Sequence, residues 1–366
     1  MEKAKIGAYQ FFVLLLLFEL GSAVLVPIAI GANRDAWIAI LISTIGGVFL
    51  FLVYYRLYKF YPQLTPSEYM EKLLGKFFGK ILAFAYILFF VYISARVLRD
   101  FGEMLLSFAY VDTPLFIVNT LFILVIIYAI QKGIEVIART GELFFNLLYL
   151  LAVIGFILIV SSGLIDLNQL KPFLEQGWTT VFKVVVTETL YVPFGEAFVF
   201  SVILPYIKDT KKIKYAGIAG IVLSGINLSL VMAINISVLG IDLATRSQFP
   251  LLTTVQSIQI AEFLERLDVF FMVSMVIGIF FKASIYFYAA VSGTTILFKF
   301  KEPSKLVYPI GLVILFMSIT IANSYSEHLT EGLDLTTRYL HPFFLVLAPV
   351  FLLAIAYMKN RKRKKK

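Results

Sequence analysis

The chain has 366 residues, of which 60% are hydrophobic and only 15% are charged, and its formal net charge is +9. About a quarter of the residues of a soluble globular chain are charged, so this composition excludes an ordinary soluble protein and predicts an integral membrane protein. Because the chain has no cysteine, it excludes disulfides, thiolate metal sites and a cysteine nucleophile. Its two histidines are His328 and His341, so no metal site and no cofactor are expected.

Ten segments are long and apolar enough to span a bilayer, which takes about 20 residues per helix. We therefore predict an all-α membrane protein with a single transmembrane domain over residues 1–366. The first segment is not a signal peptide, because its apolar stretch is too long. The segments lie at 9–31, 36–58, 79–110, 115–131, 142–162, 182–206, 213–240, 267–298, 305–325 and 339–358.

The first segment, FFVLLLLFELGSAVLVPIAIG, carries Glu19, Gly21 and Ser22 near its middle and Pro27 beyond them. Glycine weakens a helix by about 1 kcal/mol, and proline removes a backbone donor. A carboxylate inside the membrane is costly unless it is paired or neutralised. These features predict a break in the helix close to Gly21.

The loop before the third segment has the features of a helix start. Thr65 can cap a helix whose third residue is Glu68. Tyr69, Leu73 and Phe77 then share one face, with lysines beside it. We therefore expect a short helix that lies on the inner membrane surface and serves mainly as an anchor.

The third segment contains two pairs of opposite charges spaced four residues apart. Arg96 with Asp100 and Arg99 with Glu103 predict two structural ion pairs near its outer end. Tyr92, about one turn deeper, is a candidate for lining a site near mid-membrane. In a helix rich in Phe and Tyr, packing is the alternative role for this side chain.

Polar positions elsewhere indicate packing rather than a site. Three asparagines in the fifth and seventh segments, Asn146, Asn227 and Asn235, are expected to hydrogen-bond between helices. The stretch EFLERLDVFF at 262–271 has the pattern of an amphipathic helix start.

The sixth segment contains LYVPFGEAF, in which Tyr191, Pro193, Phe194, Gly195 and Glu196 stand together, with a second proline further on. Proline and glycine again predict a broken helix. Such a break frees N–H and C=O groups that lipid cannot satisfy. It survives only where it is buried in protein or lines a wet cavity.

The ten predicted helices divide into five plus five, over 9–162 and 182–358. Helix 6 would run opposite to helix 1, so related halves are inverted repeats, in which equivalent helices share interruptions. The paired breaks in helices 1 and 6 therefore predict a transporter-type binding site near the midplane. The alternative explanation is a pair of packing kinks.

The predicted site has two electrostatic halves. The N–H groups of a half-helix that begins after Gly21 favour an anion, and the carbonyls freed around residues 191–194 favour a cation. A zwitterion such as an α-amino acid fits both halves. The candidate ligand-binding residues are Glu19, Gly21, Ser22, Tyr92, Tyr191, Pro193, Phe194, Gly195 and Glu196.

Three charged residues are expected within several ångströms of the midplane: Glu19, Glu196 and, on helix 8, Lys282. Two carboxyl groups and one ammonium leave one negative charge unless a carboxyl holds a proton. A proton-linked or switching role is therefore one interpretation, and a static ion pair that stabilises the bundle is the other. Glu188 lies higher on helix 6 and is expected to face an outer vestibule.

Lys and Arg are unevenly distributed along the chain. With the N-terminus in the cytoplasm, most of the 32 basic residues fall on the inner side, so the positive-inside rule predicts that both termini are cytoplasmic. The basic tail at 359–366 is expected to contact anionic lipid rather than to act as a nuclear signal or RNA-binding patch. A nucleic-acid partner is not expected.

Three motifs carry a family resemblance: YQFFVLLLLFELGSAVLVP at 9–27, PFGEAFVFSVILP at 193–205, and the stretch at 248–282 that ends in Lys282. They resemble the spore-germination permease family, the B subunits of nutrient germinant receptors, within the amino acid–polyamine–organocation transporter fold. The resemblance implies the inner spore membrane, A-type and lipoprotein C-type partner subunits, and sensing of an amino acid or similar nutrient. It also implies that Lys282 substitutes for sodium between helices 1 and 8, close to Glu19 or Gly21.

Three functions are considered: a ligand-sensing receptor subunit, a proton-coupled secondary amino acid transporter and an intramembrane enzyme. An enzyme is not expected, because the H-E-x-x-H and G-x-S-x-G motifs are absent and no histidine or cysteine base is near Glu19 or Glu196. The receptor and the transporter share a site and differ in whether the ligand crosses the membrane. We favour the receptor.

Overall fold

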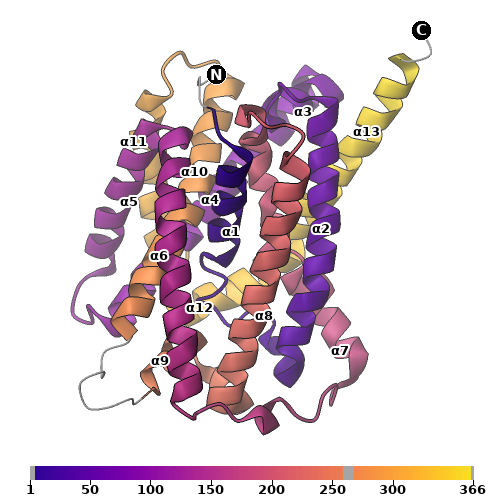
Figure 1. The fold of residues 1–366 in the computed structure, drawn as a ribbon. Helices are drawn as coiled ribbons and strands as arrows, with labels where there is room; N and C mark the ends of the chain where they lie inside the picture. Colours follow the sequence, from indigo (N-terminus) through magenta and orange to yellow (C-terminus); the bar gives the residue numbers. More distant parts are fainter. Residues whose placement is uncertain (1–4, 259–267, 364–366) are drawn as a thin grey trace.

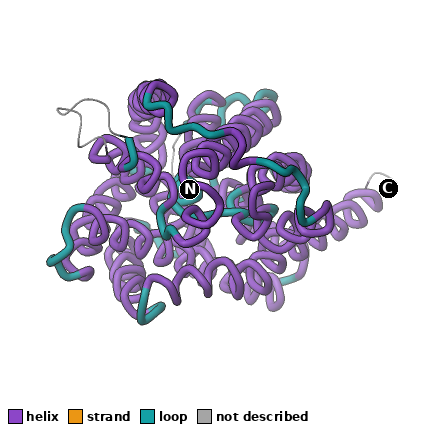
Figure 2. The backbone as a smooth tube through the Cα atoms, turned by 90° about the horizontal axis from the view of Figure 1, so that it is seen from below, coloured by secondary structure: helices purple, strands orange, loops and turns teal. Residues whose placement is uncertain are grey.

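The fold is built from helices. The computed structural model describes residues 5–258 and 268–363, and within these ranges the chain forms helices and loops (Figure 2). One parallel bridge pairs Ile6, before the first helix, with Ile207, after the broken sixth one. The expected all-α class is confirmed.

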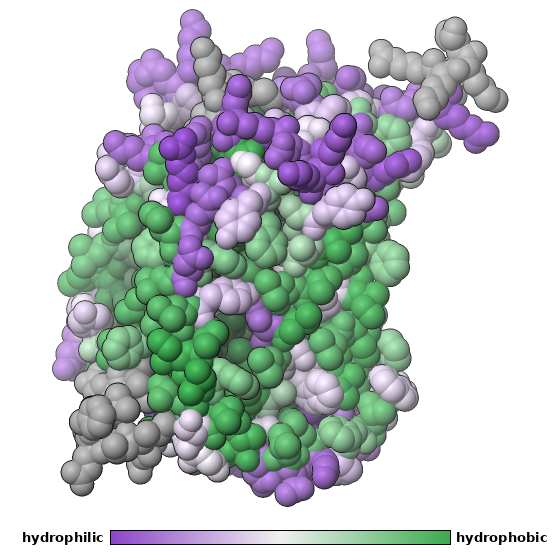
Figure 3. Space-filling model, in the orientation of Figure 1, coloured by the Kyte–Doolittle hydropathy of each residue, from purple (hydrophilic) through white to green (hydrophobic). Residues whose placement is uncertain are grey.

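Eight segments of the described chain are long and apolar enough to cross a membrane, and two shorter apolar helices accompany them, Ala8–Leu20 and Ser304–Thr320. Figure 3 shows a broad hydrophobic band between hydrophilic ends, as expected of a multi-pass membrane protein. The count of ten crossings and the division into two repeats stay predictions. The eight segments are Ile30–Phe60, Lys76–Phe108, Leu115–Lys132, Ile134–Ser161, Gly177–Val202, Ile213–Arg246, Val269–Phe298 and Tyr325–Arg361.

Irregular helical elements concentrate in the first, sixth and last of the predicted segments. The α-helices are α1 (Ala8–Leu20), α2 (Ala36–Phe60), α3 (Pro66–Leu74), α4 (Lys76–Phe108), α5 (Leu115–Lys132), α6 (Ile134–Ser161), α7 (Gly177–Val184), α8 (Ile213–Arg246), α9 (Pro250–Gln256), α10 (Asp268–Phe298), α11 (Ser304–Thr320), α12 (Tyr325–Thr330) and α13 (Ala348–Arg363). The 3₁₀ elements are η1 (Ile30–Asp35), η2 (Leu167–Leu170), η4 (Phe194–Val202) and η5 (Leu204–Tyr206), and the π-helical ones are η3 (Val185–Thr189), η6 (Glu331–Leu340) and η7 (Pro342–Leu347).

Two helical regions begin earlier than the sequence predicts. The fifth is predicted to start at residue 142, but α6 starts at Ile134. The last is predicted to start at residue 339, but α12 starts at Tyr325. The additional turns at both starts carry ion pairs spaced four residues apart. Arg139 lies 2.6 Å from Glu135 in α6, and Arg338 lies 2.9 Å from Asp334 in η6. Residues up to 267 of the stretch predicted at 262–271 lie outside the described residues.

Helix α1 runs through the interior of the bundle, against α6, α8 and α10 (Figure 1). Its residues from Val13 to Phe18 are all at most 1% exposed, as suits a helix that is apolar on every side. The start of α1 and the end of α13 lie at the same end of the molecule (Figure 1). This arrangement fits an even number of crossings.

The short helix predicted near residue 65 is α3. Its capping box is present, with the backbone N–H of Thr65 donating to Glu68 Oε2 at 2.8 Å. The helix ends before Gly75, whose positive φ of 84° interrupts the predicted face. Tyr69 and Leu73 are 2% and 3% exposed, so the predicted lipid-facing side is wrong, and the position of the helix at the membrane surface stays a prediction. This apolar face packs into the protein.

The outer end of α4 has one of its two predicted ion pairs. Arg99 Nη2 lies 2.7 Å from Glu103 Oε1, as expected. Arg96 does not pair with Asp100, because Asp100 faces His328, whose Nε2 lies 3.0 Å from Oδ1. Arg96 donates to the backbone carbonyl of His328 instead. The predicted Arg96–Asp100 pair is therefore replaced by contacts to α12.

Two of the three asparagines hydrogen-bond between helices as expected. Asn227 on α8 donates to the Tyr149 hydroxyl on α6 at 2.6 Å. Asn235 accepts from Thr254 on α9 at 2.9 Å. The prediction is wrong for Asn146, which donates to a backbone carbonyl of its own helix.

Candidate functional site

The first helix is broken where the sequence predicts. Helix α1 ends at Leu20, and Gly21 has φ −2° and ψ −114°, outside the helical region. Residues 21–29 form successive turns before η1 begins. This stretch includes Pro27, which has no backbone donor, and Ala29, whose φ is 61°. The half-helix expected directly after Gly21 is therefore absent, and its N–H groups belong to turns.

Two glycines let α10 approach this break. A Cβ on Gly278 would lie 3.3 Å from the Cα of Gly21. A Cβ on Gly21 would lie 3.0 Å from both Cβ and Cδ of Lys282 and 2.8 Å from the Phe18 carbonyl oxygen. Gly21 thus supplies the bend in the backbone and the space that the Lys282 stem occupies.

The sixth helix is broken as well. Helix α7 and the π-helical η3 end in a turn that contains Pro193 after a cis peptide bond, and η4 follows. The Gly195 N–H donates to the Leu190 carbonyl at 3.0 Å, and the Glu196 N–H donates to the Tyr191 carbonyl at 3.2 Å. Carbonyls that were expected to face a ligand are thus partly engaged by the chain itself. Each keeps a second lone pair for another donor.

Lys282 joins the two breaks. Its Nζ lies 2.6 Å from Glu196 Oε2 in an ion pair whose side chains are 1% and 3% exposed. The same ammonium lies 5.4 Å from the centre of the Phe18 ring on α1, within cation–π distance. The stem of Lys282 packs against Gly21, its ammonium contacts Phe18 on α1, and its ionic partner is Glu196.

Glu19 is a buried carboxyl of this centre that has no hydrogen-bond partner. Its side chain is 0% exposed, and neither carboxyl oxygen has a hydrogen-bond partner. Leaving a buried carboxyl without a donor is costly, and the cost is removed when a donor or a positive charge arrives. Glu19 is therefore the candidate of this centre to bind a hydrogen-bond donor or a positive charge of a ligand.

Tyr92 does not reach the breaks. Its hydroxyl lies 2.9 Å from Thr336 Oγ1 on η6 and 3.3 Å from Arg96 Nη1. It thus connects α4 to the last helical region. Among the predicted site residues, Gly21 and Glu196 lie against Lys282, whereas Tyr92 has a different contact.

Glu188 has a partner in the turns after Gly21. It was expected to face an outer vestibule, but its Oε1 accepts a hydrogen bond from the Ala29 N–H at 2.7 Å. This bond joins η3 of the sixth helix to the far end of the turns after Gly21. The two irregular segments are therefore connected at the Glu188 carboxylate as well as at Lys282.

Tyr54 on α2 is a residue of the site that sequence reasoning missed. Its hydroxyl donates to the carbonyl of Gly195 at 3.1 Å and to the carbonyl of Leu345. It therefore holds the sixth-helix break against the last helical region. Tyr54 is one of 20 tyrosines in the chain, and no spacing or neighbouring motif distinguishes it from the others.

We expect Tyr54→Phe to lower the stability by about 1–3 kcal/mol, because it leaves buried carbonyls without their donor. We also expect it to weaken the ligand response, since the Gly195 carbonyl is no longer held. Thermal unfolding of the purified protein and its binding of the expected ligand measure the two effects. The control is Tyr86→Phe, which removes a 2.6 Å bond to the Phe344 carbonyl but leaves the Gly195 carbonyl with its Tyr54 donor. Equal ligand responses in both variants would contradict the role of Tyr54.

The centre is closed to solvent, with Glu19 0%, Glu196 3% and Lys282 1% exposed. Beside it lies an apolar cavity of about 200 Å³ between α1, α6, α8 and α10, and Gly21 is part of its lining. On the face shown in Figure 3 the surface is hollowed between α6 and α8. The charged groups are thus sealed in the protein, and a ligand reaches them only if surrounding helices move.

Comparison with known proteins shows to which family the chain belongs. A family model described as "Spore germination protein" matches residues 5–326. The chain belongs to the spore germination protein family. Spore germination protein KB of Bacillus subtilis (strain 168) is 53% identical over 365 residues, which cover 100% of this chain and 98% of that protein. Spore germination protein YndE of the same organism is 26% identical over 91% of this chain and 90% of its own length.

The chain has the architecture of a solved structure described as MhsT in complex with L-phenylalanine. The TM-score is 0.73, and the match covers 97% of this chain and 90% of that one at 14% identity. An identity this low shows the fold alone. This spore germination protein therefore has the same fold as that structure.

Proposed function

We propose that this spore germination protein is the B subunit of a nutrient germinant receptor, which binds an amino acid or similar small molecule and triggers germination. Its family and its relative spore germination protein KB support the role in germination. The observation that carries the ligand site is Lys282, which contacts both the break after α1 and the break between η3 and η4, beside the unpartnered carboxyl of Glu19.

The proposed ligand is an α-amino acid held between the two breaks. Its ammonium meets Glu19 and the remaining lone pairs of the carbonyls at residues 191–194. Its carboxylate meets the Ser22 hydroxyl and N–H groups of the turns that follow Gly21. Lys282 serves as a fixed cation in place of sodium. L-Phenylalanine, present in the solved structure of the same fold, is a ligand of this class.

The receptor role implies partners and an orientation. We propose that the chain acts with A-type and lipoprotein C-type subunits in the inner spore membrane, with both termini in the cytoplasm. The termini share one end of the molecule (Figure 1), and the basic residues that precede and follow the helices support this orientation.

A second function, proton-coupled amino acid transport, is favoured by the charges of the centre. Two carboxyl groups share one ammonium, and Glu19 lacks a partner of its own. A proton taken up with the ligand would balance the remaining charge. Uptake therefore separates the two functions, because a receptor binds its ligand without carrying it across.

The test uses the purified chain in detergent and in proteoliposomes. A screen of labelled amino acids, sugars and nucleosides is expected to find saturable binding of at least one amino acid. Absence of uptake by the proteoliposomes supports the receptor, and uptake driven by a proton gradient supports the transporter. Saturable binding of a sugar or nucleoside but of no amino acid would overturn the ligand class.

We expect Ser22→Val to weaken binding of an amino acid about tenfold, which corresponds to about 1.4 kcal/mol for one lost polar contact to a charged group. The primary amine of the same side chain, which lacks the carboxylate, should bind as it does to the unchanged protein. Competition binding with the two compounds measures the difference. Equal losses for both compounds would indicate general misfolding and contradict a carboxylate site at the Gly21 turns.

A further inference from the structure

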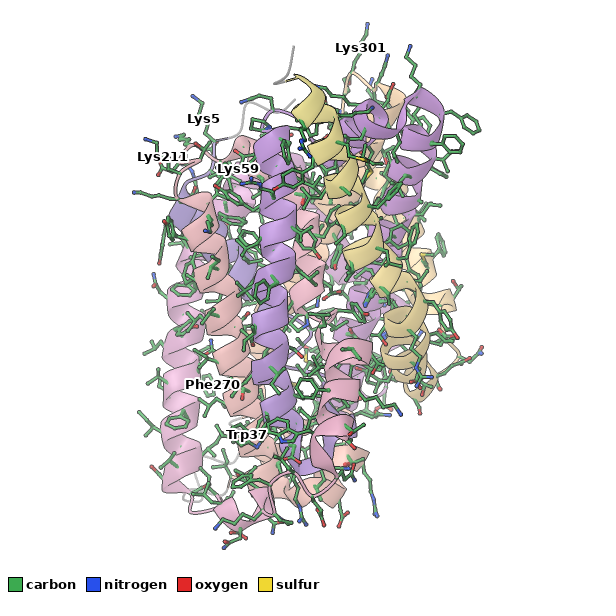
Figure 4. The ribbon with its side chains drawn as sticks, turned by 90° about the vertical axis from the view of Figure 1, so that its right-hand side faces the viewer. Lys5, Trp37, Lys59, Lys211, Phe270 and Lys301 are labelled. Carbon is green, nitrogen blue, oxygen red and sulfur yellow. The ribbon has the colours of Figure 1, made fainter. Side chains whose placement is uncertain are left out.

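A groove runs along the outer face of α2, between α8 and α13, at the end of the molecule that carries both termini. Its volume is about 470 Å³. In Figure 4 this face is toward the viewer, with α2 in front and Lys59 labelled near its upper end. The two breaks lie on the other side of α2, so the groove is separate from the proposed ligand site.

The lining of the groove changes from apolar to cationic along α2. Phe49, which is 66% exposed, and Leu52 form the deeper part with Leu353 of α13. Arg56 and Lys59 follow toward the helix end. At 1.5 Å per residue, Phe49 and Lys59 are about 15 Å apart along the axis. This spacing corresponds to the upper part of an acyl chain and the headgroup that follows it.

The cations of the groove are held in place without carboxylate partners. Arg56 Nε donates to the Tyr357 hydroxyl at 2.7 Å, and its guanidinium lies 5.6 Å from the centre of the same ring. Lys59 Nζ lies 5.9 Å from the Tyr55 ring centre. Lys214 closes the groove from α8. Over the described residues, none of these three cations forms an ion pair with Asp or Glu, so their charge is available to a ligand.

We propose that this groove binds one anionic phospholipid of the leaflet on the side of the termini. The phosphate lies among Arg56, Lys59 and Lys214, and one acyl chain lies along Phe49, Leu52 and Leu353. Charge complementarity selects an anion, and the apolar floor selects an anion that carries a hydrocarbon chain. A soluble phosphate would leave that floor unused, so the occupant is a membrane lipid.

Through this site a membrane lipid contacts α2, the helix that holds the break in the sixth helix. Tyr54, which donates to the Gly195 carbonyl, stands between the groove-lining residues Leu52 and Arg56 on α2. A lipid that fixes the outer face of α2 therefore acts on the helix whose inner face holds Gly195. The lipid site does not depend on which nutrient the chain binds.

Native mass spectrometry of the full chain tests the proposal, with phosphatidylglycerol and phosphatidylcholine titrated separately. Wild type is expected to retain one phosphatidylglycerol in preference to phosphatidylcholine. Each cation near a lipid phosphate contributes about fivefold in affinity. The triple variant Arg56→Gln, Lys59→Gln, Lys214→Gln should therefore bind about 100-fold more weakly. Glycerol phosphate, which lacks acyl chains, should not compete at millimolar concentration.

The matched control removes three exposed lysines from the same end of the molecule: Lys76→Gln, Lys80→Gln and Lys301→Gln. Its affinity for phosphatidylglycerol should stay within about twofold of wild type. An equal loss in this control would show a general attraction to basic surface and overturn the site. Competition by glycerol phosphate would identify an anion site without a chain and would overturn the lipid.

Discussion

Replacing Lys282 by methionine is expected to abolish the ligand response and to lower the stability by about 3–5 kcal/mol. Methionine keeps a flexible apolar stem against Gly21 but removes the ammonium that lies 2.6 Å from Glu196 Oε2. Glu196 is then a carboxylate at 3% exposure without its cation. Thermal unfolding of the purified variant and germination of spores that carry it measure the two effects.

The geometry also predicts which second change restores Lys282→Met. Adding Glu196→Gln removes the stranded charge and should recover most of the lost stability. Adding Glu19→Gln should recover less, because Glu19 is not the ionic partner of Lys282. The control is Lys183→Met on α7, an exposed lysine, which should cost little. If Lys282→Met were as stable as this control, the buried pair would not support the bundle.

The position of Lys282 also predicts that the ligand response does not depend on sodium. An ammonium fixed between α1 and α10 leaves no need for sodium at that position. The ligand response should therefore be unchanged when potassium replaces sodium at constant ionic strength. A response that rises with sodium would contradict the role of Lys282 as a cation substitute.

The features that the sequence predicts well depend on neighbouring residues. Hydropathy places α2, α4 and α8 near the predicted segments, because about 20 consecutive apolar residues suffice to define a crossing. The breaks at Gly21 and Pro193 are local as well, since glycine and proline act on their own backbone. The charged centre was predictable because few charges lie in such segments, so Glu19, Glu196 and Lys282 stand out.

The features that the sequence misses depend on partners distant in the chain. Asp100 contacts His328, which lies 228 residues further along the chain, and not the neighbouring Arg96. Tyr54 bonds to Gly195, which lies 141 residues further along the chain, and the residues next to Tyr54 in the sequence do not indicate this contact. The buried face of α3 resembles a membrane-surface face for the same reason, because burial in lipid and burial in protein select the same side chains. Tertiary partners therefore decide what local patterns leave open.

The break in the sixth helix should not tolerate a large side chain at Gly195. A Cβ there would lie 3.2 Å from the Leu190 carbonyl oxygen and 3.3 Å from Leu345 Cδ1. The Gly195 N–H bonds to that same Leu190 carbonyl, and its own carbonyl accepts from Tyr54. A larger side chain therefore has to move the turn that contains Pro193, together with the lone pairs proposed to face the ligand.

We expect Gly195→Leu to abolish ligand binding and germination while the protein still inserts in the membrane, and Gly195→Ala to show a smaller loss of affinity. The insertion follows from hydropathy, which leucine raises, and the loss follows from the displaced turn. Membrane fractionation and binding to the purified variants measure the two separately. Gly141→Ala on α6 is the control, because its new methyl group would meet side-chain atoms of Leu14 at 3.3 Å that can shift. Normal ligand sensitivity in Gly195→Leu would mean that the break serves packing alone, and the ligand would then have to bind elsewhere.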